Sequence, residues 1–266
     1  MTGLDAALLR RRPANPAHVW DLLRALIARD MKLRYKRSVM GVAWTLLNPL
    51  AELLILFFIF SLVLPLNIPD YPAFLFTGIL VYGWFQTSLF FATGAIVLNR
   101  ELVRQPGFPV PILPVVTVST NLIHFLLALP VLFLLLIYSG VTLTWAVLAL
   151  PVLIALQFTL TLSLAYLVAT FHVRFRDTQY LLRVLLQLLF YLTPVFYDGS
   201  AIPARYQSLY NLNPMVFLVD GYRAVLIRGE LPNAGPLAAV SVAAAVLLYV
   251  GVGVFSRASA RFVDEL

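Results

Sequence analysis

The chain has 266 residues, of which 61% are hydrophobic and only 12% charged, and its formal net charge is +7. A soluble domain carries roughly twice that share of charged residues, so the composition predicts an all-α integral membrane protein. Because cysteine is absent and the basic residues lie beside apolar segments, disulfides and cysteine-based metal sites are excluded, and we expect the charge to meet membrane lipids rather than nucleic acid.

The first 40 residues form a basic arm that we expect to stay in the cytoplasm. Arg10, Arg11 and Arg12 are followed by Pro13 and a charged segment, so a cleavable signal peptide is not expected. After Pro16, apolar residues recur at helical spacing, which predicts a basic amphipathic helix in the headgroup plane. Such a helix anchors the arm and is compatible with contact to a cytoplasmic partner.

Six apolar segments approach the roughly 20 residues that a helix needs to cross a bilayer. They span 41–64, 73–97, 112–138, 145–171, 181–197 and 236–256, of which the fifth is short. Connections that carry arginine alternate with connections that have no Lys or Arg, which places both termini in the cytoplasm. The exception is the long connection 198–235, which carries arginines and would lie outside. The chain is thus expected to be one domain, with a cytoplasmic arm over 1–40, a six-span bundle over 41–256 and a cytoplasmic tail over 257–266.

A few residues inside the expected spans could line a transport path. Glu52 is a carboxylate well inside the first span, where acidic groups usually face a bundle interior or a water-filled cavity; a structural carboxylate is the alternative. Aromatic faces suit sugar rings. The channel candidates are Glu52, Trp84, Phe85, Tyr191 and Phe196. A lone residue, His124, is expected to hydrogen bond between helices.

Two connections are predicted to contain short helices. After the second span, the residues from Asn99 onward can form a helix that Pro106-Gly107 stops. After the fifth span, Asn213-Pro214 opens a helix too short to span, with Gly229 placed to end it. Because charged residues lie in its middle, this segment is expected to be an interfacial or re-entrant helix on the extracellular side.

The motifs of catalysis and nucleotide binding are missing from the sequence. The three histidines are far apart, no acidic pair lies in the spans, and no glycine-rich phosphate-binding loop occurs. We therefore expect no catalytic site, metal or cofactor in this chain. Uphill transport would then need an ion gradient or a separate ATPase, and the lack of a charged relay through the spans favours the ATPase.

Residues 29–44, followed by Asn48-Pro49, strongly resemble the start of the first span in permease subunits of type-2 ABC exporters of polysaccharides. These are the exporters of O-antigen, capsule and teichoic acid. Three further stretches match in order, at 99–114, at 175–177, and at 212–214 with Tyr222-Arg223 and Gly229. The resemblance implies a homodimeric channel in the bacterial inner membrane. It also implies a lipid-linked polysaccharide as substrate and a separate ATPase subunit that binds ATP and Mg.

The resemblance also implies residue roles. The coupling helix that meets the ATPase would use Asn99, Arg100, Glu101, Leu102, Arg104 and Gln105. Partners of the lipid diphosphate would be Arg34, Tyr35, Lys36 and Arg37, for which plain membrane anchoring is the alternative. The outer gate would contain Asn213, Pro214, Tyr222 and Arg223. The first and fifth spans would line the path and the dimer seam.

Other functions remain open at this point. A permease of the same superfamily could export a small drug or lipid, although the Arg34-Tyr35-Lys36 motif and the outer Tyr222-Arg223 helix favour a polymer. An ion-coupled transporter would need a charged relay, for which Glu52 and His124 are a thin basis. A membrane enzyme of glycan modification would need an acid–base or metal constellation that the sequence lacks.

Overall fold

The structure, a computed structural model, describes residues 16–36, 38 and 40–265, and all regular secondary structure in that part of the chain is helical. Arg10, Arg11, Arg12 and Arg37 lie outside the described residues. The main α-helices are α2 (Pro16–Arg34), α3 (Trp44–Phe57), α4 (Tyr71–Gly94), α5 (Arg100–Val103), α6 (Ile112–Tyr138), α7 (Leu150–Arg174), α8 (Thr178–Leu192), α9 (Ala204–Tyr210), α10 (Pro214–Arg223), α11 (Ala234–Ser259) and α12 (Phe262–Glu265).

Five helical segments are long and apolar enough to cross a membrane, as the sequence predicts. They are Trp44–Val63, Tyr71–Gly94, Ile112–Tyr138, Trp145–Arg174 and Ala234–Ser259. The first consists of α3 and a π-helical turn over Phe58–Val63, and the fourth begins with a 3-10 turn over Trp145–Ala149 that leads into α7. These bounds agree with the expected spans within a few residues.

The expected fifth span is shorter than predicted. Only Thr178–Leu192, 15 residues, is helical, and the chain is irregular from Thr193 to Asp198. Pro194 accounts for this ending, because proline disfavours the helical conformation of the residue before it and has no N–H to donate. At about 1.5 Å per residue such a helix falls short of a bilayer core, so a crossing here remains a prediction.

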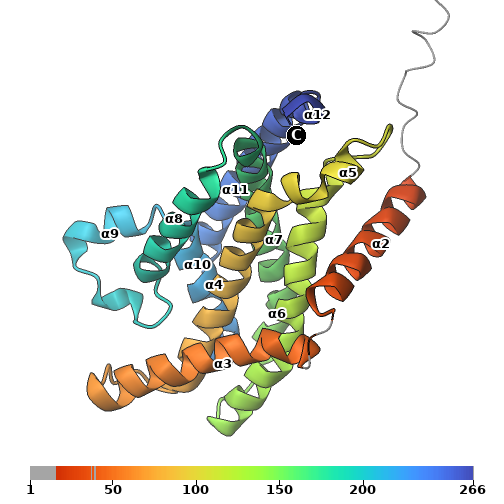
Figure 1. The fold of residues 1–266 in the computed structure, drawn as a ribbon. Helices are drawn as coiled ribbons and strands as arrows, with labels where there is room; N and C mark the ends of the chain where they lie inside the picture. The colour runs from red at the N-terminus through yellow and green to blue at the C-terminus, as the bar shows by residue number, and fades with distance from the viewer. Residues whose placement is uncertain (1–15, 37, 39, 266) are drawn as a thin grey trace, which may run out of the picture.

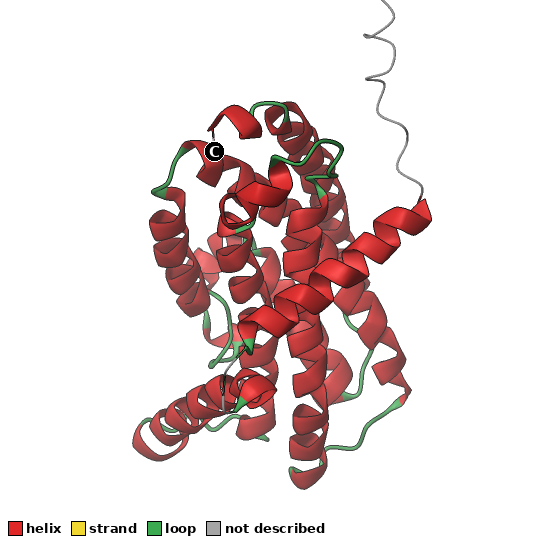
Figure 2. Ribbon diagram, turned by 45° about the vertical axis from the view of Figure 1, so that its right-hand side comes forward, coloured by secondary structure: helices red, strands yellow, loops and turns green. Residues whose placement is uncertain are grey.

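The first apolar helix is oriented differently from the rest. Figure 1 shows α3 lying across the lower end of the bundle, whereas α4, α6 and α7 run along it, and Figure 2 agrees. It packs on α4 and touches α6. Its outer face is apolar and uncovered, with Leu54 67% and Phe58 57% exposed. The count of six spans therefore stays a prediction.

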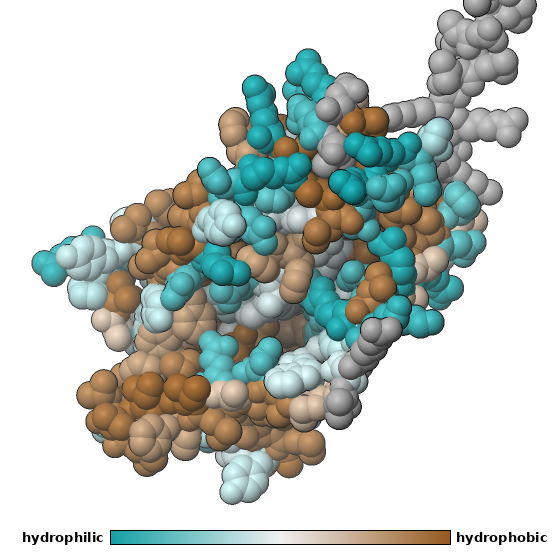
Figure 3. Space-filling model, in the orientation of Figure 1, coloured by the Kyte–Doolittle hydropathy of each residue, from teal (hydrophilic) through white to brown (hydrophobic). Residues whose placement is uncertain are grey.

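Two apolar cores hold the bundle together. The larger joins α4 with α6, α7, α10 and α11, and α4 is its most buried helix. The smaller joins α2, α5, the start of α6, α7, α11 and α12 through residues that include Leu26, Val103, Phe255 and Phe262. Figure 3 shows polar side chains gathered towards the end where α5 and α12 lie, and apolar ones over α3. At that polar end, α2, α5 and α12 pack together through the smaller core, and we call this end the platform.

Candidate functional site

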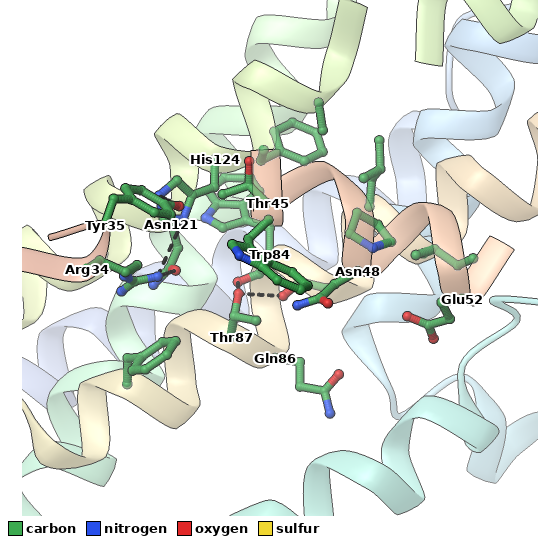
Figure 4. A pocket seen from close by; sticks show the side chains of 18 of the residues that line it. Arg34, Tyr35, Thr45, Asn48, Glu52, Trp84, Gln86, Thr87, Asn121 and His124 are labelled. Atoms are coloured by element: carbon green, nitrogen blue, oxygen red, sulfur yellow. Dashed lines mark hydrogen bonds between the residues drawn. The ribbon is translucent and has the colours of Figure 1, made fainter. Parts of the chain in front are cut away.

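A pocket of about 450 Å³ lies where the end of α2 and the start of α3 meet α4 and α6. Figure 4 shows one group of polar side chains at one end of this pocket and Glu52 at the other. The labelled polar and aromatic lining residues are Arg34, Tyr35, Thr45, Asn48, Glu52, Trp84, Gln86, Thr87, Asn121 and His124. Amides, hydroxyls and an indole beside aromatic faces suit a hydroxylated ligand such as a sugar.

Arg34 is held by several neighbours at its end of the pocket. It donates to Asn121 Oδ1 at 3.1 Å, lies 3.7 Å from the Asp30 carboxylate and stacks over the Phe91 ring at 4.3 Å. Its guanidinium also lies 3.4 Å from His124 Nδ1. These contacts fasten the end of α2 to α4 and α6. Arg34 is therefore a structural clamp as well as a positive charge beside the pocket.

His124 lies between helices, as the sequence predicts. Its Nε2 is 3.0 Å from the Tyr35 hydroxyl, and the two rings meet edge to face. Burial raises the pKa of Tyr35, against the opposing effect of Arg34, so the phenol stays protonated. Lys36, the next residue of the predicted headgroup set, is exposed in the following turn.

The predicted channel residues divide between three places. Glu52 and Trp84 line the pocket, and the Trp84 indole N–H has no hydrogen-bond partner among the described residues. Phe85 is buried and packs against Tyr82 in the larger core, and its place in the channel stays a prediction. Tyr191 and Phe196 contact each other at the end of α8, away from the pocket.

The predicted coupling helix forms, and it is anchored from behind. Arg29 of α2 donates to Asn99 Oδ1 at 2.6 Å, and Asn99 in turn donates to the Ala95 carbonyl. Val103 is buried in the smaller core. The side that faces away from the core is polar and exposed; it comprises Arg100, Glu101, Arg104 and Gln105. Asn99 and Leu102, which are both half-buried, therefore hold the helix in place and contribute less to its exposed surface.

Two of the four predicted outer-gate residues, Tyr222 and Arg223, are buried, and the other two, Asn213 and Pro214, are half-buried. Asn213 caps α10 by accepting from the Met215 N–H and also donates to Thr193 Oγ1 at 2.9 Å, which ties α10 to the end of α8. Tyr222 is fully buried. After α10 the chain forms a π-helical turn over Ala224–Arg228, and this helical segment ends at Gly229, which has φ +68°. The cap and the stop follow the sequence prediction.

Arg223, at the end of α10, is held by several internal partners. It is only 3% exposed, and its guanidinium donates to the carbonyls of Phe74, Pro194 and Val195 while it stacks on the Phe74 ring at 3.3 Å. Burial lowers the pKa of Arg223 to about 9, opposed by the Asp220 and Asp198 carboxylates, so it is charged at neutral pH. One cation thus joins α10, the end of α8 and the start of α4.

Gly78 on α4 gives the first test of this junction. A Cβ on Gly78 would lie 2.6 Å from the Val195 carbonyl oxygen and 2.9 Å from Arg223 Nη2. We expect Gly78→Ala to destabilise the protein by roughly 1–3 kcal/mol, because backbone or guanidinium must move. Gly83→Ala is the matched control, since Gly83 lies on the same helix with nothing within 4 Å of its added Cβ. Thermal unfolding in detergent would show it; equal midpoints for both variants would contradict the expected clash.

The fold and the pocket define a helical membrane protein with a polar site between its spans. The sequence profile of the ABC-2 type transporter family matches residues 21–227, and the chain belongs to that family. Integral membrane localisation and a role as a transport component follow from this membership.

Several relatives are similar over nearly their whole length. An O-antigen export system permease protein, RfbA, of Myxococcus xanthus is 38% identical over 92% of this chain and 95% of its own length. The RfbA protein of Klebsiella pneumoniae is 30% identical over 95% of this chain and 97% of its own. A polysialic acid transport protein, KpsM, of Escherichia coli is 25% identical over 87% and 91%.

Some pocket residues were not expected from the sequence. Gln86, Thr87 and Asn121 carry no motif, and they meet Asn48 only because α3 and α6 cross the same stretch of α4. Asn48 precedes Pro49, which marks an irregular helix start but not a site. A polar residue in an apolar helix was the available signal, and it does not tell a ligand site from a helix–helix hydrogen bond.

Proposed function

We propose that this chain is the permease subunit of an ATP-driven exporter that moves a lipid-linked polysaccharide across the bacterial cytoplasmic membrane. The observation that carries the proposal is the near full-length similarity to proteins named for O-antigen export and polysialic acid transport. The polar, aromatic pocket supports it, because its amides and indole suit sugar hydroxyls and ring faces. The chain itself would perform no covalent chemistry.

The energy would come from a separate ATPase subunit that carries ATP and Mg. The surface proposed to meet it is formed by exposed residues of α5 and of the turn that follows it, Arg100, Glu101, Arg104 and Gln105. The end of the bundle that holds α5 and α12 would therefore be cytoplasmic, with both termini on that side. The α8–α10 connection would then lie at the outer face, with Arg223 as part of the outer gate.

Two copies of the chain would form the channel. Both α3 and α8 leave apolar side chains uncovered in a single copy, among them Ile55 at 61% exposed and Leu181 at 65%. Packing these faces against a second copy would bury them and enclose a path beside the pocket. The first and fifth apolar segments are those that the resemblance assigns to the dimer seam.

The pocket gives a prediction about transport. We expect Trp84→Ala to reduce export of the polymer about tenfold, equivalent to roughly 1.4 kcal/mol, because it removes an aromatic face and an N–H donor from the pocket. Glu52→Gln should act in the same direction if the carboxylate contacts the substrate. Surface polymer per cell, normalised to permease amount, is the measurement. Tyr249→Ala, an exposed aromatic change on α11, is the control; equal export by all variants would exclude the pocket from the path.

The test of the function itself is a reconstitution. The chain is co-expressed with a candidate ATPase subunit from the same organism, purified through a tag on the chain, and assayed for ATP hydrolysis. A stable, stoichiometric and active complex is expected. A chain that purifies without any candidate ATPase, or transport driven by an ion gradient alone, would contradict the proposal and favour an ion-coupled carrier. Export of a small drug or lipid in place of polymer would move the assignment within the family.

A further inference from the structure

A second pocket, of about 380 Å³, lies where α7 and α11 end and α12 begins. Three arginines line it, Arg174, Arg257 and Arg261, together with one described carboxylate, Glu265. Positive groups therefore outnumber negative ones among the described lining residues. A pocket with this balance favours an anionic occupant.

The three guanidiniums have no polar partner among the residues that the structure describes. Within the described part of the chain, the side chains of Arg174, Arg257 and Arg261 make no hydrogen bond or ion pair, and only that of Arg174 stacks, over the Phe175 ring at 5.6 Å. By contrast, Arg34 and Arg223 are both held by several internal partners. A guanidinium is a fork of donors that matches a phosphate group, so three free forks in one pocket are suited to phosphate oxygens.

The position of the pocket indicates which kind of phosphate it would meet. It lies at the ends of two membrane-length segments, Trp145–Arg174 and Ala234–Ser259, and thus at the boundary between hydrocarbon and headgroups. Its wall is partly apolar: Phe171 and Phe175 line it and are each about half exposed. An apolar wall next to free arginines matches a lipid, with an acyl chain below a charged headgroup.

The walls of this pocket are fixed by close packing. α7 and α11 touch at Gly251, where an added Cβ would lie 2.7 Å from the Ser163 carbonyl oxygen. Above that contact, Phe255 packs edge to face on Tyr166 and on Phe262, which holds α12 against the bundle. Binding would therefore cost little reorganisation, because the elements that carry the arginines are already in place.

We propose that this pocket binds the headgroup of an anionic phospholipid through Arg174, Arg257 and Arg261. The site is separate from the transport pocket between α2, α3, α4 and α6, and the proposal does not depend on which substrate is exported. α12 also contacts α5, so an occupied site would stabilise the platform that carries the proposed coupling helix. The bound lipid would act as a structural partner of that platform.

The experiment measures lipid selectivity of the full chain. The purified protein is equilibrated with vesicles of phosphatidylcholine and phosphatidylglycerol in equal amounts, re-isolated, and its retained lipids are quantified by mass spectrometry. We expect enrichment of phosphatidylglycerol in the native chain and a loss of about tenfold or more in Arg174→Gln/Arg257→Gln/Arg261→Gln. Arg205→Gln, which changes an exposed arginine on α9, is the matched control and should keep the enrichment.

Two further measurements keep the outcome decisive. Glu265→Gln removes the carboxylate from the pocket and should raise the enrichment, and the single Arg257→Gln variant replaces the triple variant if that fails to fold. Unchanged enrichment in the arginine variants would overturn the proposal. Displacement of the lipid by millimolar inorganic phosphate would also overturn it, in favour of a free-anion site. If the triple arginine variant keeps its lipid but no longer co-purifies with the ATPase subunit, the proposal is overturned and the arginines are assigned to protein contact.

Discussion

Arg223→Ala is expected to prevent the chain from accumulating in a folded form. The substitution removes four hydrogen bonds to the carbonyls of Phe74, Pro194 and Val195 and empties the volume above the Phe74 ring. Hydrogen bonds to charged groups contribute roughly 1.5–3 kcal/mol each, and carbonyls left buried without partners add a penalty, so a loss of more than about 3 kcal/mol is expected. Monodisperse protein recovered in mild detergent is the measurement.

The conservative variant separates charge from geometry. Arg223→Lys keeps a positive charge, but a single ammonium cannot reach three carbonyls in the arrangement that a guanidinium fork spans, so only partial recovery is expected. Arg205→Ala, an exposed arginine on α9, should leave the yield unchanged. Normal yield and normal export in Arg223→Ala would contradict the claim that Arg223 stabilises the fold. Normal yield with defective export would assign Arg223 to the proposed gate and not to folding.

The junction shows where sequence reasoning stops. Arg223 could be singled out because an ionic group in a short apolar helix needs partners. Its partners could not be named, because they are backbone carbonyls, one of them 149 residues away, and every residue type offers the same carbonyl. Local signals fared better: Asn213 as a cap and Gly229 as a stop depend only on neighbouring backbone, and both lie where predicted.

The positions of the membrane-length helices could be predicted from the sequence, but which of their residues face the core and which face lipid could not. Length and hydropathy identify segments such as Ile112–Tyr138, because bilayer thickness sets the length. In a membrane protein, however, residues that face lipid and residues that face the core are both apolar, so periodicity does not distinguish them. For this reason the sequence names Phe85 as a channel candidate and gives no sign that its side chain packs in the core. The orientation of α3 across the bundle has no sequence signal either.

The proposed coupling helix gives the second large expected effect. Glu101→Ala or Arg104→Ala should uncouple ATP hydrolysis from export: the rate of hydrolysis stays within about twofold, while export falls about tenfold or more. Both side chains are exposed, and an exposed ion pair such as Arg100 with Glu101, at 3.3 Å, contributes little to folding. Folding should therefore be unaffected, and the loss must arise where the helix meets its partner.

The physical reason for that loss is the way α5 is mounted. Its buried side, Val103, belongs to the core that includes Leu26 of α2 and Phe262 of α12, and Arg29 holds Asn99 at its start. A displacement of α5 by the ATPase would thus reach α2, whose far end lines the transport pocket through Arg34. Arg29→Ala tests this path: complex formation should persist while export falls. Normal export in all three variants, Glu101→Ala, Arg104→Ala and Arg29→Ala, would show that α5 does not transmit the motion of the ATPase to the transport pocket.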